Sequence, residues 1–250
     1  MIALAVGVAL VAVAAAISVR RGLGVERELA VAVLRGVVQL GAVTLVIQAI
    51  FDHLGLSAAF AAVMVVAAAF TAGRRIRPLP AAVPVAGVAS AAAAALCLLP
   101  LFAAGAFPLS PQYVIPVAGI VIGGAMKATS VAGMRLLDDL GDHRAEVEAR
   151  LALGDSAREA LRPSTRRAAI TALVPAIDQT RNVGLVTLPG AFVGMLLGGA
   201  SPVEAAQVQL TVLFALLGAE ALAATFITML VTRAVIRPGE RIDPPARTAG

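Results

Sequence analysis

Charged side chains are absent from one long stretch of this 250-residue chain and rare in a second, and this pattern limits the folds open to it. Residues 78 to 126 contain no charged residue, and between Arg181 and Arg233 the only charges are Glu204 and Glu220. A helix needs about 20 apolar residues to cross a bilayer, so each stretch is too long for one crossing and suits two. The sequence therefore predicts helical hairpins whose two ends return to the same side of a membrane.

The composition agrees with a chain that crosses a membrane several times. Hydrophobic residues make up 60% of it, charged residues 14%, and the mean hydropathy is +0.92, an apolar content that no soluble domain can bury. Because lipid cannot satisfy backbone hydrogen bonds, the spans must be helices. We therefore expect an all-α polytopic membrane protein with seven transmembrane helices, at residues 2–19, 33–51, 57–73, 82–103, 113–136, 183–199 and 207–232.

The arginines predict the orientation of these spans. They cluster beside span ends, and an excess of Lys and Arg marks the cytoplasmic side. Arg20 and Arg21 follow the first span instead of preceding it, which argues against a signal peptide and places the N-terminus outside and the C-terminus in the cytoplasm. We expect a multi-pass protein of the inner (cytoplasmic) membrane. Its net charge of +5 should interact with the headgroups of the lipid bilayer, and we expect no nucleic acid as a partner.

One polar segment, residues 138–181, interrupts the single domain expected for residues 1–250. It should lie on the cytoplasmic side, between the fifth and sixth spans. Residues 143–153 have the pattern of a short amphipathic helix with Val147 and Leu151 on its apolar side. Two interpretations are open: a docking element whose apolar side a partner protein covers, or a solvated linker with local helical order.

Glycine and capping signals divide the rest of this segment. Gly154 should end the first short helix with a positive φ. Ser156 and Glu159 have the spacing of a capping box and should begin a second helix. That helix should end at Pro163, and a third should begin near Ser164 and lead toward the next span.

Part of the amino-acid sequence of this segment resembles a known motif. Glu148-Ala149-Arg150, three further residues and then Gly154 resemble the cytoplasmic loop of ABC transporter permeases, in which Glu-Ala-Ala and a glycine at this spacing form the coupling helix that binds the ATPase subunit. A longer downstream pattern is similar to the permease family of the iron-export ABC transporters (FetB type), related to the aluminium-tolerance permeases. It reads Pro175-Ala-Ile-Asp-Gln-Thr-Arg-Asn-Val-Gly-Leu-Val-Thr-Leu-Pro-Gly190, and Ile115-Pro116 with Gly119 and Ile122-Gly123 also fit.

This resemblance covers the whole chain and implies a transport subunit. Two copies of the chain would form the pathway as a homodimer, and two separate ABC ATPase subunits would drive the export of iron. The chain itself would bind no cofactor, because ATP is used by the partner subunit. The resemblance assigns ATPase coupling to Glu148, Ala149, Arg150 and Gly154.

Charges inside or beside the expected spans are candidates for the pathway. Lys127, the only lysine, falls halfway along the fifth span at a stretch where the family usually carries amide side chains, and Glu220 falls within the seventh. Each is costly in lipid and must face protein or water. Lys127 has two possible structural roles: it pairs with Glu220, or it reaches toward a membrane interface. The functional alternative is that it lines the pathway. Asp178 and Arg181, at the expected boundary before the sixth span, either pair on one helix face or serve the pathway.

Small residues repeat along the sixth expected span. Gly190, Gly194 and Gly198 recur every four residues, a spacing that lets two helices approach closely in lipid, either within one subunit or between two copies. Pro189 precedes them and predicts a kink or hinge.

Several chemistries are missing from the sequence. It has no Walker A phosphate loop, no Gly-x-Ser-x-Gly and no His-Glu-x-x-His motif, so we expect no ATPase or hydrolase site of its own. The single cysteine, Cys97, excludes internal disulfides, and the possible metal ligands are too sparse for a tight cage, so the metal site stays unknown. The alternative function is an integral membrane enzyme acting on a lipid-linked or membrane substrate, which needs a catalytic constellation that the sequence does not display.

Overall fold

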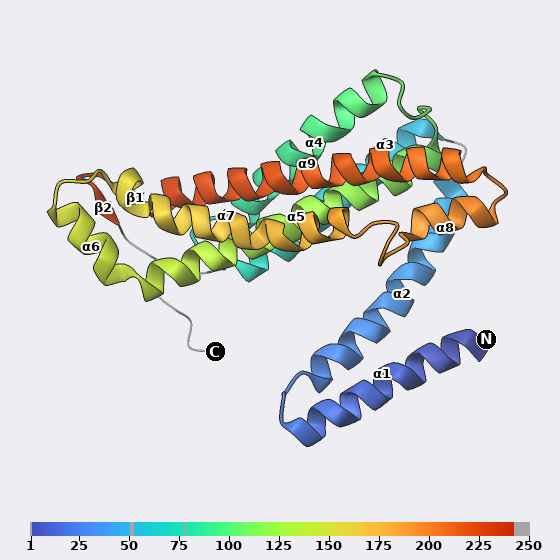
Figure 1. Cartoon of the computed structure of the whole chain (residues 1–250), viewed down its shortest axis with the longest axis horizontal. Coiled ribbons are helices and arrows are strands. Elements are labelled where there is room, and N and C mark those ends of the chain that lie inside the picture. The colour runs from blue at the N-terminus through green and yellow to red at the C-terminus, as the bar shows by residue number, and fades with distance from the viewer. Residues whose placement is uncertain (1, 51–52, 78, 243–250) are drawn as a thin grey trace. The chain divides into compact units, whose positions relative to one another are not determined.

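The computed structural model of the chain describes residues 2–50, 53–77 and 79–242. It contains two compact units, Met1–His53 and Leu54–Gly250, which are described separately below (Figure 1).

The first unit is a helical hairpin. It consists of α1 (Ile2–Arg21) and α2 (Glu26–Ile50). Gly22 and Gly24 both have positive φ in the turn between the helices, a conformation that glycine adopts without steric cost. Ser18 Oγ donates a 2.9 Å hydrogen bond to Glu26 Oε1 across this turn, so the turn is held by side chains as well as by backbone geometry.

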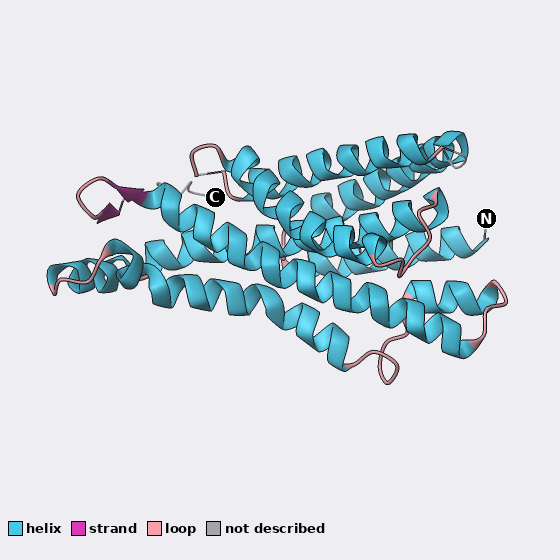
Figure 2. Ribbon diagram, turned by 90° about the horizontal axis from the view of Figure 1, so that it is seen from above, coloured by secondary structure: helices cyan, strands magenta, loops and turns pink. Residues whose placement is uncertain are grey.

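Five long helices form the bundle of the second unit (Figures 1 and 2). They are α3 (Leu54–Arg75), α4 (Ala82–Ala103), α5 (Pro111–Asp142), α7 (Ala157–Arg181) and α9 (Pro202–Val235). Two short helices, α6 (Arg144–Ala152) and α8 (Gly190–Leu197), lie at opposite ends of the bundle, which we call the α6 end and the α8 end. After α9 the chain forms a small antiparallel hairpin of β1 (Ile236–Arg237) and β2 (Arg241–Ile242).

The contact between α5 and α9 forms the centre of the bundle (Figure 1). Its packing depends on small residues, because a Cβ added at Gly124 would lie only 2.1 Å from Leu216 Cδ1. At Gly133 an added Cβ would lie 3.3 Å from Ile227 Cγ1 of α9. Close approach of this kind favours association in lipid, where dispersion contacts replace the hydrophobic drive. The buried side chains around these glycines are mostly alanines, among them Ala125, Ala128, Ala132, Ala219, Ala223 and Ala224.

The expected class of helical membrane protein is confirmed. The prediction that the sixth span is a single helix is wrong. Among the described residues, α2, α3, α4, α5 and α9 are long and apolar enough to cross a bilayer, and the 20-residue α1 covers the expected first span. Within residues 183–199, however, α8 has only eight residues. Two residues interrupt helical geometry before α8. Gly184 has a φ of 83°, and Pro189 has no N–H to donate to a helical hydrogen bond. The number of seven spans and their orientation stay predictions.

α7 is one helix of 25 residues, so the expected break at Pro163 is wrong. The helix begins with the expected capping box of Ser156 and Glu159, whose hydrogen bonds hold the pKa of Glu159 below its usual value. A proline removes one backbone hydrogen bond, but the buried stripe of α7 packs against α5 and α9 along its length and outweighs that loss. This stripe consists of Ala157, Ala160, Leu161, Ser164, Ala168, Ala172 and Ala176.

Candidate coupling surface and embedded charges

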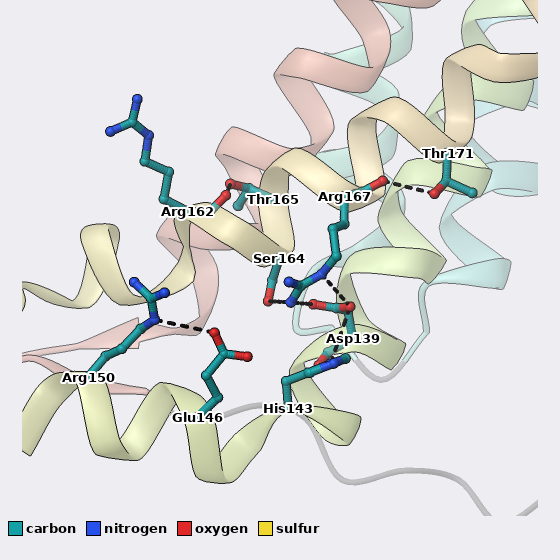
Figure 3. A network of polar contacts seen from close by, with 9 residues as sticks. All are labelled: Asp139, His143, Glu146, Arg150, Arg162, Ser164, Thr165, Arg167 and Thr171. Carbon is teal, nitrogen blue, oxygen red and sulfur yellow. Dashed lines mark hydrogen bonds and ion pairs between the residues drawn. The ribbon is translucent and has the colours of Figure 1, made fainter.

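α6 and the turn after it form a projection at the α6 end of the bundle (Figure 1). Arg144 Nε donates a 2.7 Å hydrogen bond to Glu148 Oε1, and Arg150 Nε donates a 3.4 Å hydrogen bond to Glu146 Oε1. The second pair is four residues apart on one helix face, and Figure 3 shows its two side chains facing each other. Both pairs are largely exposed, so they order the surface more than they stabilise it.

The apolar side of α6 faces the protein's own core, and the expectation that a partner covers it is wrong. Val147 is only 6% exposed and belongs to the buried cluster that includes Leu140. Leu151 and Ile242 of the β-hairpin pack against the same cluster. The apolar residue that remains open is Leu153, which is 87% exposed. Leu153 is the C-cap residue of α6, and the sequence pattern of this segment does not single it out.

Gly154 has the conformation that the sequence predicted for it. Its φ is 100°, and the reversal that it allows brings the Asp155 N–H to within 3.1 Å of the Arg150 carbonyl oxygen. An added Cβ at position 154 would meet no atom within 4 Å. A side chain at this position would therefore strain the backbone without causing a clash.

An ion pair fixes α7 to the end of α5. Arg167 Nη2 donates a 2.8 Å hydrogen bond to Asp139 Oδ2, and Arg167 Nε donates a 3.1 Å hydrogen bond to Asp139 Oδ1. This bidentate geometry is the strongest that arginine forms with a carboxylate. Arg167 also donates to Ser164 Oγ, and His143 Nδ1 lies 3.4 Å from Asp139 Oδ1 (Figure 3). The start of α6 is thereby connected to both long helices.

Lys127 and Glu220 lie near the middle of the two central helices. Lys127 is the seventeenth of 32 residues in α5 and is exposed, whereas Glu220 is the nineteenth of 34 in α9 and is 8% exposed. The ammonium group interacts favourably with the carboxylate by Coulomb attraction, but no ion pair within 4.0 Å joins them in the described chain. Glu220 Oε2 is buried without a hydrogen-bond partner in the structure. A buried carboxylate oxygen left unpaired is costly, which marks Glu220 for a role beyond packing.

Asp178 and Arg181 lie farther from the α6 end than the sequence indicated. Residues near the start of α7 share a groove with residues 225–233 of α9, whereas residues 183–189, just after α7, share a cavity with residues 206–210. Asp178 and Arg181 therefore lie beside α9 within the range expected to cross the membrane. Both are exposed, and no ion pair within 4.0 Å joins them in the described part of the chain, so the expected pair is absent.

The chain between α6 and α9 consists of two helices with an irregular segment between them. α7 runs from the α6 end along α5 and α9, residues 182–189 leave helical geometry, and α8 packs against α9 at the other end (Figure 1). Leu185 is 90% exposed and Val186 77% exposed in this irregular segment. Non-helical backbone within a bilayer must be covered by protein or line a water-filled cavity. The second unit alone does not supply such a cover.

Gly190 and Gly194 of α8 have no close neighbour among the described residues of the second unit. Pro189 is the N-cap of α8, and an added Cβ at Gly190 or Gly194 would meet no atom within 4 Å. At Gly198 it would meet only backbone atoms of α8 itself. Within the second unit, the described residues therefore leave Gly190 and Gly194 without a packing partner.

A cavity of about 210 Å³ lies between the segment 183–189, α8 and α9. Gln209 of α9 contributes its polar wall, is 7% exposed, and has its Oε1 atom buried without a hydrogen-bond partner in the structure. Elsewhere the described residues contain no group of three or more His, Cys, Asp or Glu side chains that could hold a metal ion.

Comparisons with known proteins give several relatives along most of the chain. It is 39% identical over 224 residues to UPF0014 membrane protein STAR2 of Oryza sativa subsp. japonica, which covers 89% of this chain and 79% of the relative. It is 36% identical over 228 residues to the protein ALUMINUM SENSITIVE 3 of Arabidopsis thaliana, with 90% and 84% covered. It is 30% identical over 232 residues to the probable iron export permease protein FetB of Escherichia coli (strain K12), with 92% and 90% covered.

No solved structure matches the chain. The model of the uncharacterised protein family UPF0014 matches residues 1–236. This match covers α1 to α9 and the first residue of β1, and the relatives named above cover nearly the same range. The chain therefore belongs to the UPF0014 family of membrane proteins, which includes a relative named as a permease.

Proposed function

We propose that this chain is the membrane-spanning permease subunit of an ABC exporter, in which two copies form the pathway and two separate ATPase subunits supply the energy. One observation carries the proposal. Glu148, Ala149 and Gly154 keep the spacing of the permease coupling loop, and these residues are exposed on a projection at one end of the helical bundle. The relative named a probable iron export permease supports the same class.

The contacts around α6 connect this projection directly to the helices of the bundle. Val147 anchors α6 in the core, and the ion pair of Asp139 with Arg167 joins α5 to α7. α7 then packs along α5 and α9 as a single helix. Protein interiors transmit displacement because they are close-packed. Closure of the ATPase subunits on α6 would therefore displace α7 together with the irregular segment that follows it.

A second copy of the chain is the proposed cover for the surfaces left open at membrane depth. Lys127, Asp178 and residues 182–189 are exposed in one copy, although charges and non-helical backbone do not face lipid. Gly190 and Gly194 present a small-residue face without a neighbour among the described residues of the second unit. Small faces of this kind let helices of two subunits approach closely. The homodimer would thus enclose the broken crossing at its seam.

We propose iron as the cargo and Glu220 and Asp178 as the acids that it meets. Carboxylates bind hard and borderline divalent cations, and Glu220 has a buried oxygen without a partner in the structure. Lys127 would neutralise Glu220 while no cation is bound, because its positive charge attracts the carboxylate and repels a metal ion. A cation held by one carboxylate at a time is released quickly, as a transport pathway requires.

Reconstitution tests this proposal. The chain would be co-expressed with a candidate ABC ATPase, purified through a tag on the chain alone, and placed in vesicles that contain a fluorescent chelator of ferrous iron. We expect the ATPase to co-purify in equal amount, and chelator quenching to require ATP. Quenching that proceeds equally without the ATPase or without ATP would contradict the proposal.

A further inference from the structure

A groove of about 360 Å³ lies between the first half of α7 and the last third of α9. One face of each helix supplies its walls. On α7 these are Arg158, Arg162 and Thr165, spaced at i, i+4 and i+7, and on α9 they are Thr225, Thr228, Met229, Thr232 and Arg233. The groove has no place in the coupling surface or among the embedded charges described above.

Three arginines give this groove an excess of positive charge. No Asp or Glu lines the groove, and Arg158, Arg162 and Arg233 form no ion pair within 4.0 Å in the described chain. Three acids lie near these arginines along the chain. Glu159 closes the capping box with Ser156 and also attracts Arg162, Asp155 lies 3.7 Å from Arg150, and Glu240 accepts the hydrogen bond of the Ala157 N–H. Figure 3 shows Arg162 pointing away from the network around Asp139.

The threonines complement the arginines by accepting hydrogen bonds. Thr165 donates its hydroxyl hydrogen to the Arg162 carbonyl, Thr228 to the Ala224 carbonyl and Thr232 to the Thr228 carbonyl. The hydrogen of each hydroxyl is thereby used, and the oxygen lone pairs remain for a ligand that donates. The groove therefore offers donors from guanidinium groups and acceptors from hydroxyl oxygens. A phosphate group next to an alcohol has the matching chemistry.

The direction of the groove indicates a lipid as the source of that phosphate. Arg233 lies in the last turn of α9, whereas Thr225 and Met229 lie deeper in the helix that is apolar and long enough to cross a bilayer. On α7, Arg158 is in the first turn and Thr165 lies two turns farther in. Charge is thus placed at one end and weakly polar or apolar side chains at the other, as a headgroup followed by its acyl chains requires.

We propose that this groove binds the headgroup of an anionic phospholipid, such as phosphatidylglycerol, at the cytoplasmic face of the membrane. The three arginines contact the phosphate, and the threonine oxygens accept hydrogen bonds from the headgroup alcohol. The bound lipid bridges α7, which follows the coupling turn, and α9, which carries Glu220. This inference does not depend on the proposed cargo or on the ATPase partner.

Thermal unfolding of the chain, purified free of lipid in a neutral detergent, tests this inference. Three probes would be titrated separately: dioleoylphosphatidylglycerol, dioleoylglycerol and glycerol 3-phosphate. Affinity follows from the rise of Tm with ligand concentration. We expect dioleoylphosphatidylglycerol to raise Tm at concentrations where the other two probes do not. Equal stabilisation by dioleoylglycerol would show that acyl chains alone bind, and equal stabilisation by glycerol 3-phosphate would assign the groove to soluble phosphate compounds; either result overturns the proposal.

Charge variants locate the site. The triple variant Arg158→Gln, Arg162→Gln, Arg233→Gln should bind dioleoylphosphatidylglycerol about a hundredfold more weakly, because each arginine near a lipid surface contributes about a fivefold factor. The control Arg74→Gln, Arg75→Gln, Arg77→Gln removes the same charge from exposed positions outside the groove and should change affinity less than threefold. If the groove triple variant does not fold, Arg233→Gln alone should give about a fivefold loss. Equal losses in groove and control variants would overturn the proposal.

Discussion

Glu220 of α9 lies directly against Gly124 of α5, so closely that a Cβ added at position 124 would be 3.0 Å from Glu220 Oε1. The same Cβ would be 2.1 Å from Leu216 Cδ1. The glycine thus makes room for a carboxylate in the middle of the bundle. This relationship connects the packing of the two central helices to the candidate pathway acid.

Gly124→Ala should leave the folded chain less stable than Gly123→Ala, because a methyl group at position 124 forces the ends of the Leu216 and Glu220 side chains to move, while both substitutions gain the same helix propensity. Gly123→Ala is the matched control, since an added Cβ at Gly123 would meet no atom within 4 Å. Thermal unfolding in detergent measures both. We expect a lower Tm for Gly124→Ala than for Gly123→Ala, and equal Tm values for the two variants would contradict the close packing.

Glu220→Gln should preserve insertion and yield but reduce efflux of ferrous iron, because it removes a charge and keeps the shape of the side chain. Glu204→Gln is the control on the same helix, since Glu204 is exposed in the capping box at the start of α9. Efflux from cells loaded with iron measures the effect. If Glu220 serves only to balance Lys127, the double change Glu220→Gln with Lys127→Met should instead restore losses seen in either single variant. Unchanged efflux in well-expressed Glu220→Gln would remove this residue from the pathway.

Leu153 and Val147 should respond differently to truncation, because one is exposed and the other is buried. Leu153→Ala should leave Tm unchanged and weaken binding of the ATPase subunit, since it removes apolar surface that only a partner can cover. Val147→Ala should cost about 1 to 3 kcal/mol of folding stability through the lost methyl groups and the resulting cavity. Thermal unfolding and co-purification separate the two effects. ATPase binding unchanged by Leu153→Ala would place the partner elsewhere.

Membrane topology is checked with single cysteines, because Cys97 is the only native cysteine and Cys97→Ala gives a cysteine-free background. A cysteine at Ala106, in the exposed turn between α4 and α5, should react with an impermeant thiol reagent from outside the cell. Leu153→Cys should react only after the membrane is opened. A reporter after Gly250 should be cytoplasmic and a tag before Met1 external. Labelling of both cysteines from the same side would exclude the proposed orientation.

The sequence predicted the features that depend on local chemistry. Charge-poor stretches located α4, α5 and α9, and the capping box of Ser156 and Glu159 and the positive φ of Gly154 were both correct. The misses depend on tertiary packing. Pro163 stays within α7 because the helix packs on two neighbours, and Val147 is buried because the β-hairpin and α5 cover it. The contact of Gly124 with Glu220 joins residues far apart in the chain, which no local pattern reveals.

Substitution of Gly154 tests the central claim that the turn after α6 couples this chain to an ATPase. Gly154→Val places a branched side chain at φ 100° and should distort the turn, whereas Gly199→Val imposes the same kind of strain at φ 91° in the turn at the α8 end. The direct measurement is the amount of ATPase that co-purifies with each variant at equal membrane yield. We predict that Gly154→Val loses most of the ATPase and Gly199→Val retains it. Wild-type recovery of an active ATPase with Gly154→Val would contradict the coupling role, and with it the assignment of this chain as an ABC permease.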